Sequence, residues 1–118
     1  MDMEALKAWG ADTDEGLSRC MGMEAFYLRL AESVKTEEHF AELFTALEEA
    51  DAPRAFGAAH ALKGVLGNLS LTPLYGPMSE LCELLRGRED LALSEEEAQV
   101  CACLVAGIRE AYDTYRAL

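Results

Sequence analysis

The stretch from Pro53 to Leu69 places its apolar residues on one face of a single helix. At about 100° per residue, the apolar side chains centre roughly 200° away from His60. These residues are Ala55, Ala58, Ala59, Leu62, Val65, Leu66 and Leu69. Lys63, Gly64 and Gly67 fall within about 60° of His60, so they form one stripe on the opposite face. Such a helix must bury its apolar face against other elements, which predicts a helical assembly.

Further helical segments with definable ends precede this stretch. We predict helices over residues 3–9, 12–20, 23–35 and 36–51, with Asp12 and Thr36 as N-caps. Alanine, leucine and glutamate dominate the composition and β-branched residues are scarce, which also favours helices. The apolar residues that recur at helical spacing in the last two segments are Phe26, Leu30, Val34, Phe40, Leu43, Phe44 and Leu47.

The segment after Leu71 contains a helix with an awkward beginning. Thr72 and Pro73 suit the N-cap and the first position of a helix that runs to about residue 86. Because a proline inside a helix removes a hydrogen bond, we expect an irregular first turn or a late start near Pro77.

A capping box formed by Ser94 and Glu97 starts the last helix, which we expect to run to about residue 116. Its residues available to the core are Val100, Cys101, Leu104, Val105, Ile108, Tyr112 and Tyr115. Four main amphipathic helices with short joints predict an all-α fold, an antiparallel up-down four-helix bundle with one or two short extra N-terminal helices. We expect a single domain over residues 1–118, with the bundle core at about 23–116.

The charge distribution limits the partners of the chain. The formal net charge is −12, which argues against nucleic acid or an anionic membrane. Between Ala52 and Ser79 there is no Asp or Glu, so this stretch carries +2 and the other residues carry −14. This window predicts a face that receives negative charge, although a buried central helix with few charges would look similar.

The chain lacks the sequence signatures of several other classes of protein. The N-terminus has no signal-peptide pattern, and no apolar run approaches the roughly 18 residues of a membrane span. The four cysteines (Cys20, Cys82, Cys101 and Cys103) form no Cys-x-x-Cys motif, so buried free thiols are expected and zinc or redox chemistry is not. The absence of Glu-x-x-His and His-Glu-x-x-His argues against di-iron and zinc sites. We therefore expect a cytoplasmic monomer without a metal or cofactor.

His60 and Lys63 supply a nucleophile and a cation one helical turn apart. An exposed imidazole is largely uncharged at pH 7, and its Nε2 lone pair can attack phosphorus. A transferred phosphoryl group carries charge on its equatorial oxygens, which the Lys63 ammonium can stabilise. Gly64 and Gly67 each cost roughly 1 kcal/mol inside a helix relative to alanine. We interpret them as a surface cleared for the approach of a partner.

Three further side chains also need an interpretation. Phe56 lies on the His60 stripe one turn earlier, as a docking contact or as a residue packed against another helix. Asn68 either bonds the backbone or orients a partner. His39 stands beside two glutamates and is expected to be a solvated residue rather than a functional one.

The segment from His60 to Gly64, followed by Gly67, Asn68 and Leu69, resembles the His-x-Leu-Lys-Gly signature of histidine-containing phosphotransfer (HPt) domains of bacterial two-component phosphorelays. Residues 14–27 are similar to that family's first conserved block. Ser70-Leu71 stands where the family often has Gly-Ala, and Gly76-Pro77 interrupts the next helix. Both departures affect packing and partner choice rather than the phosphoacceptor.

The resemblance implies that His60 is a phosphoacceptor exposed midway along one helix of a bundle. It implies transfer from the aspartyl phosphate of one receiver domain, in a response regulator or a hybrid histidine kinase, to the aspartate of another. It places Lys63 beside the phosphorylated imidazole and assigns the magnesium to the receiver. The chain would then be a phosphocarrier without an ATP site and not an enzyme.

Two alternatives share the bundle and the histidine. One is the phosphoacceptor domain of a chemotaxis-type histidine kinase. The other is a bundle that binds a receiver without transferring phosphate.

Overall fold

The structure, a computed structural model, describes all 118 residues, and its regular elements are all helical. This confirms the predicted fold class. In chain order the elements are α1 (Met3–Trp9), α2 (Thr13–Arg19), α3 (Glu24–Ser33), the 3₁₀ helix η1 (Val34–Thr36), α4 (His39–Glu48), α5 (Ala52–Asn68), α6 (Thr72–Leu85) and α7 (Glu95–Arg116).

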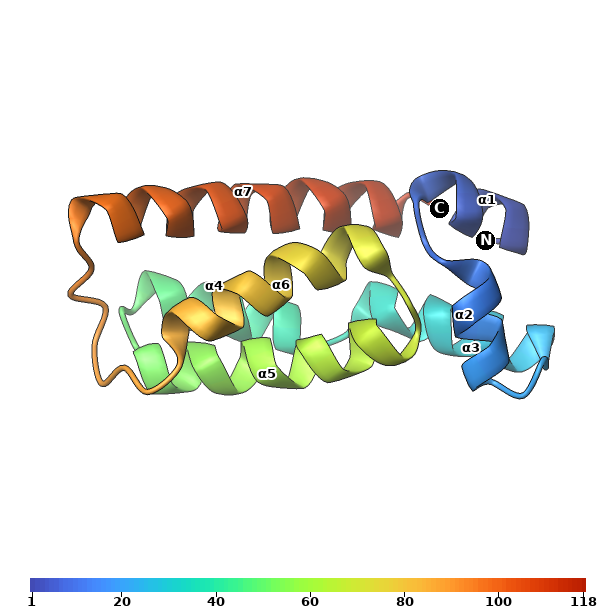
Figure 1. The fold of residues 1–118 in the computed structure, drawn as a ribbon, viewed down its shortest axis with the longest axis horizontal. Helices are drawn as coiled ribbons and strands as arrows, with labels where there is room; N and C mark the ends of the chain where they lie inside the picture. The colour runs from blue at the N-terminus through green and yellow to red at the C-terminus, as the bar shows by residue number, and fades with distance from the viewer.

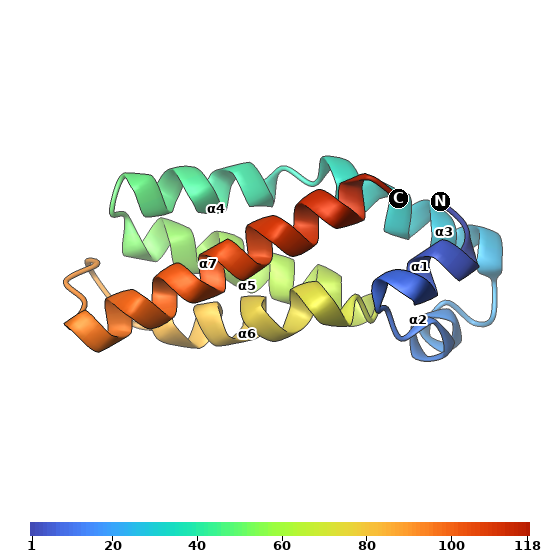
Figure 2. The same cartoon turned by 90° about the horizontal axis from the view of Figure 1, so that it is seen from above.

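Helices α4 to α7 form the antiparallel bundle (Figure 1). Helix α5 packs between α4 and α6, and α7 packs mainly on α6. Figure 2 shows that α3 leads through η1 into α4 along one edge of the bundle. The short helices α1 and α2 lie beyond the end of α5, at the end of the bundle that also carries both termini (Figures 1 and 2). The molecule is elongated, with extents of 44 × 20 × 20 Å.

The core contains the predicted apolar face of α5. Leu62 and Leu66 are fully buried, and Val65 is half-buried. Burying a leucine contributes about 2 kcal/mol relative to exposure, so this face fixes which side of α5 remains outside. The buried residues that surround it from the other bundle helices include Phe40, Leu43, Leu74, Met78, Leu81, Leu85 and Ile108.

The predicted N-cap at Thr36 is wrong. Thr36 lies in η1, and α4 begins three residues later at His39. The Glu37 carboxylate accepts a hydrogen bond from the His39 backbone N–H at 3.2 Å and contacts His39 Nδ1 at 2.5 Å. The N-cap of α4 is Glu38, whose side chain makes no capping hydrogen bond. The pKa of the Glu37 carboxyl is lowered, first by the His39 hydrogen bond.

The expected disturbance near Pro77 is also absent. Helix α6 starts at Thr72, with Leu71 rather than Thr72 as its N-cap, and runs through Pro77 without interruption. The missing N–H of Pro77 would have bonded the carbonyl of Pro73 in the first turn. Only one hydrogen bond near the helix start is lost, and the buried face of α6 outweighs it.

The apolar side of α7 is covered less than predicted. Ile108, Tyr112 and Tyr115 are buried as expected, but 47% of Val100 is exposed. Cys103 is exposed as well, contrary to the expectation of buried thiols, and all four cysteines are free. The reason is that α6 is the main neighbour of α7, so part of the apolar side of α7 stays accessible to solvent.

None of the helices combines the length and the apolar composition needed to cross a membrane.

Candidate functional site

His60 stands on the exposed side of α5, near the middle of the helix. The helix begins after Asp51, whose Oδ1 accepts a hydrogen bond from the Arg54 N–H at 3.2 Å, and Pro53 lies in its first turn. Ala59 and Leu62, on either side of His60, are fully buried. The packing of these neighbours therefore holds the imidazole outward.

One open surface hollow joins most of the residues singled out from the sequence. His60, Lys63, Gly64, Gly67 and Asn68 all line it. Two further residues line it that the sequence did not indicate, Arg19 from α2 and Tyr75 from α6. The predicted stripe on α5 is therefore part of a larger surface to which α2 and α6 also contribute.

Phe56 is half-buried and packs against the core, and it also stands beside the histidine. The centroids of its ring and the His60 ring are 5.7 Å apart, at an interplanar angle of 37°. The Arg86 guanidinium lies 5.1 Å from the centre of the Phe56 ring and pairs with Glu83 at 3.0 Å. Phe56 therefore packs against the core and also lies beside His60, and its role as a docking contact remains a prediction.

The two glycines of the stripe differ in their surroundings. A Cβ atom added at Gly64 would have no neighbour within 4 Å, whereas one at Gly67 would lie 3.0 Å from the Tyr75 ring. Gly67 therefore allows Tyr75 to pack closely, and its role in docking remains a prediction. Gly57, one turn before His60, is open like Gly64. Space is thus free on both sides of the histidine along α5.

Lys63 is half-buried and faces α6. Its charge reaches Glu83, whose pKa is lowered mainly by the hydrogen bond from Arg86 and to a smaller extent by the charges of Arg86 and Lys63. Lys63 and Arg86 thus place positive charge on the same side of the bundle as His60.

Arg54 does not contribute to the positive face that the charge count suggested. Its guanidinium bonds Glu42 of α4 at 2.6 Å and Glu49 at 2.5 Å. The tertiary structure thus brings carboxylates from α4 to the beginning of α5. Within the stretch from Ala52 to Ser79, the surface without these carboxylates therefore begins nearer His60.

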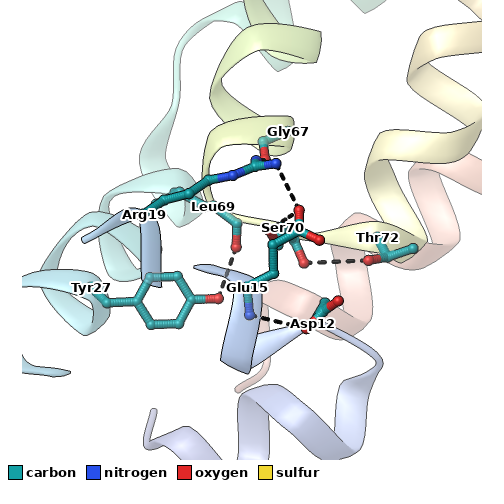
Figure 3. A network of polar contacts seen from close by, with 8 residues as sticks. All are labelled: Asp12, Glu15, Arg19, Tyr27, Gly67, Leu69, Ser70 and Thr72. Carbon is teal, nitrogen blue, oxygen red and sulfur yellow. Dashed lines mark hydrogen bonds and ion pairs between the residues drawn. The ribbon is translucent and has the colours of Figure 1, made fainter. Parts of the chain in front are cut away.

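The N-terminal segment holds the other end of α5 (Figure 3). Three carbonyl oxygens there accept hydrogen bonds from it: Gly67 O from the Arg19 guanidinium, Leu69 O from the Tyr27 hydroxyl at 2.8 Å, and Ser70 O from the Asp12 N–H at 3.0 Å. Gly67 belongs to α5, Leu69 is its C-cap, and Ser70 follows it, so these bonds tie the C-terminal end of α5 to the N-terminal segment.

Two side-chain contacts strengthen this connection. The Ser70 hydroxyl donates a hydrogen bond to Glu15 at 3.0 Å, and Arg19 pairs with Glu15 at 2.7 Å. Gly16 makes room for the Tyr27 ring, since an added Cβ would lie 2.6 Å from it. The position of α5 relative to α2 is therefore fixed by several independent bonds.

Because of Tyr27, we expect the stability of this connection to decrease at alkaline pH. Burial, followed by the charges of Cys20 and Asp12, raises its pKa to about 12, whereas an unfolded chain has a tyrosine pKa near 10. The stabilising effect of the protonated phenol is complete below about pH 10 and is lost as the pH rises toward 12. We expect wild type to lose on the order of 3 kcal/mol more than Tyr27→Phe across this range. Urea unfolding of both proteins between pH 8 and 12 measures the difference, and parallel curves would contradict it.

Sequence reasoning missed Gly57, Arg19 and Tyr75. The spacing of three residues between Gly57 and His60 could have indicated the first. No local pattern could have indicated the other two, because they reach the site only through the packing of α2 and α6 on the end of α5.

The remaining sequence candidates lie elsewhere. His39 is bound to Glu37 at the start of α4 and does not line the hollow of His60. No three His, Cys, Asp or Glu side chains gather as a metal site would require.

Comparison with protein families identifies a related family. Residues 33–117 match the family model described as the Hpt domain. A comparison with curated proteins gave no match, and neither did one with solved structures. The matched region contains α4 to α7 and all of the predicted site residues on α5, while residues 14–27 lie outside it.

Hpt domains are histidine phosphotransfer carriers of phosphorelays and interact with receiver domains. The match covers well over half of the 118 residues, and the helical bundle agrees with it. The chain therefore belongs to the Hpt domain family.

Proposed function

We propose that His60 accepts a phosphoryl group from the aspartyl phosphate of one receiver domain and passes it to the aspartate of another. The observation that carries this proposal is the position of His60, exposed midway along α5 with open space at Gly64 and Lys63 one turn away. A receiver must bring its phosphoaspartate within bonding distance of the imidazole. The free space at Gly57 and Gly64, one turn to either side of His60, permits that approach.

The transfer needs no reactant beyond the two proteins and the receiver's own metal ion. The Nε2 lone pair of neutral His60 forms the new N–P bond as the O–P bond to the aspartate breaks, and the aspartate leaves as a carboxylate. The proton on Nδ1 stays, so the phosphorylated imidazole carries a positive charge. Lys63 balances the charge of the phosphoryl oxygens. In the second step, the aspartate carboxylate of the acceptor receiver attacks the same phosphorus, the N–P bond breaks, and His60 leaves as the neutral imidazole.

The same proposal includes the setting of the reaction. The chain acts as a phosphocarrier, with the donor activated elsewhere and no ATP site of its own. We propose one domain over residues 1–118, a monomer in the cytoplasm, with receiver domains as partners and neither nucleic acid nor membrane. The strongly negative total charge supports the exclusion of the last two.

Incubation with phosphorylated receiver domains tests this function. We expect an acid-labile, alkali-stable label that peptide mapping assigns to His60. Label from a chemotaxis-type kinase alone would favour the kinase-domain alternative. Binding of receivers without any label would favour the non-transferring bundle and contradict the proposal.

Lys63→Ala should slow transfer about tenfold, because a charge-assisted contact to the phosphoryl group is lost. Lys63→Arg should keep most of the rate, since it preserves the positive charge. Rapid-quench measurements of transfer from a phosphorylated receiver give the rates, and the midpoint of urea unfolding checks the fold. Equal rates for wild type and Lys63→Ala would show that Lys63 is only a surface charge.

A further inference from the structure

Arg19 reaches the His60 surface from a part of the chain that the family match does not cover. The match begins at residue 33, and Arg19 is the last residue of α2. Its guanidinium donates a hydrogen bond to the Gly67 carbonyl (Figure 3). Arg19 also lines the same hollow as His60, Lys63 and Asn68. The N-terminal helices therefore add a positive charge, that of Arg19, to the His60 surface. Helices α4 to α7 alone do not supply this charge.

The Arg19 side chain is 44% exposed, so its charge is accessible to a partner. One of its terminal nitrogens bonds Gly67 O and the other pairs with Glu15 at 2.7 Å. A guanidinium has five N–H donors in a planar fork, and these two contacts leave donors free. Such a fork matches the geometry of carboxylate and phosphate groups.

The distance along α5 separates the role of Arg19 from that of Lys63. Gly67 lies seven residues beyond His60, which is about 10 Å along the helix. Arg19 bonds the Gly67 carbonyl, so it stands too far away to touch a phosphoryl group on His60. Its contact must be with a part of the partner outside the reacting groups.

From these observations we infer that Arg19 is a specificity-determining residue, which binds a carboxylate on the part of the receiver surface that lies outside its phosphorylated aspartate. The inference rests on the proposed phosphotransfer function. The N-terminal helices would then select among receivers by the presence of this carboxylate, while the chemistry at His60 and Lys63 stays the same for all of them.

The competing explanation is that Arg19 serves only to hold the end of α5. Two other variants separate the explanations. Tyr27→Phe removes a hydrogen bond from the same end of α5 but leaves the exposed cation in place. Glu15→Gln removes the negative charge beside Arg19, and the glutamine oxygen can still accept the Ser70 hydrogen bond.

The test compares transfer from two donors, a phosphorylated receiver and the small donor phosphoramidate, which releases ammonia as the N–P bond to His60 forms. With the receiver that transfers fastest to wild type, Arg19→Ala should raise the half-saturating receiver concentration about three- to tenfold and leave the limiting rate nearly unchanged. The half-saturating concentration of Arg19→Lys should lie between those of wild type and Arg19→Ala. Glu15→Gln should have a lower half-saturating concentration than wild type. The Arg19→Ala effect should shrink as salt rises, because salt screens an exposed charge pair.

Labelling by phosphoramidate should be equal in wild type and Arg19→Ala, since a small donor needs no docking. Equal half-saturating concentrations for these two proteins would overturn the inference. An increase in Tyr27→Phe as large as that in Arg19→Ala would also overturn it, because Arg19 would then act through the end of α5. Failure of the proposed function has a different signature, in which wild-type His60 takes no label from either donor.

Discussion

Replacing His60 with glutamine should reduce phosphoryl labelling by a phosphorylated receiver to background. The glutamine amide nitrogen has no available lone pair, so no N–P bond can form at this position. The side chain is exposed and makes no hydrogen bond that the fold needs, so stability should change by no more than about 0.5 kcal/mol. Autoradiography of the labelled protein and urea unfolding measure the two effects.

The second histidine of the chain is the matched control for this experiment. His39 is held by Glu37 at the start of α4, away from the His60 hollow. His39→Gln should therefore be labelled at the wild-type rate. Label retained by His60→Gln, or lost from His39→Gln, would show that the phosphoacceptor has been assigned to the wrong residue.

A leucine at Gly64 should slow transfer from a receiver by about a hundredfold or more. The open space above Gly64 lies one turn from His60, and a branched side chain there would hold a receiver away from the imidazole. A misplacement of about 1 Å can cost a hundredfold in rate. Because leucine is a better helix former than glycine, Gly64→Leu should be as stable as wild type or up to about 1 kcal/mol more stable.

Two controls distinguish this steric effect from a general one. Gly107→Leu makes the same change at an exposed helical glycine of α7, which lies across the bundle from α5 (Figure 1), and its transfer rate should not change. Phosphoramidate is small enough to pass the new side chain, so it should label Gly64→Leu nearly as fast as wild type. Receiver transfer to Gly64→Leu at the wild-type rate would contradict the idea of a cleared surface.

The sequence predicts N-caps and buried helix faces most accurately where the interactions lie within a single helix. The caps at Asp12 and Ser94 and the buried face around Leu62 and Leu66 all match the structure. Each depends on a periodicity of 3.6 residues or on a hydrogen bond between residues three apart. These interactions are complete within one turn or two.

The errors arose where a neighbouring side chain changed the local preference. Thr36 is a good cap by residue type, but Glu37 bonds the His39 N–H and moves the start of α4. Pro77 is a poor helix residue, yet the buried face of α6 carries the helix through it. Arg54 contributes a positive charge to the carboxylate-free stretch of the sequence, but in the folded chain Glu42 and Glu49 pair with it.

The sequence by itself determined the helices, the buried face of α5 and the outward stripe with His60, Lys63 and Gly64, because helical geometry relates residues three and four apart without reference to the rest of the fold. Only the tertiary structure decided what surrounds that stripe. Arg19 precedes Gly67 by 48 residues along the chain, and no periodicity relates the two. The packing of α2 against the end of α5 brings them together, and with them the cation that we infer to select the partner.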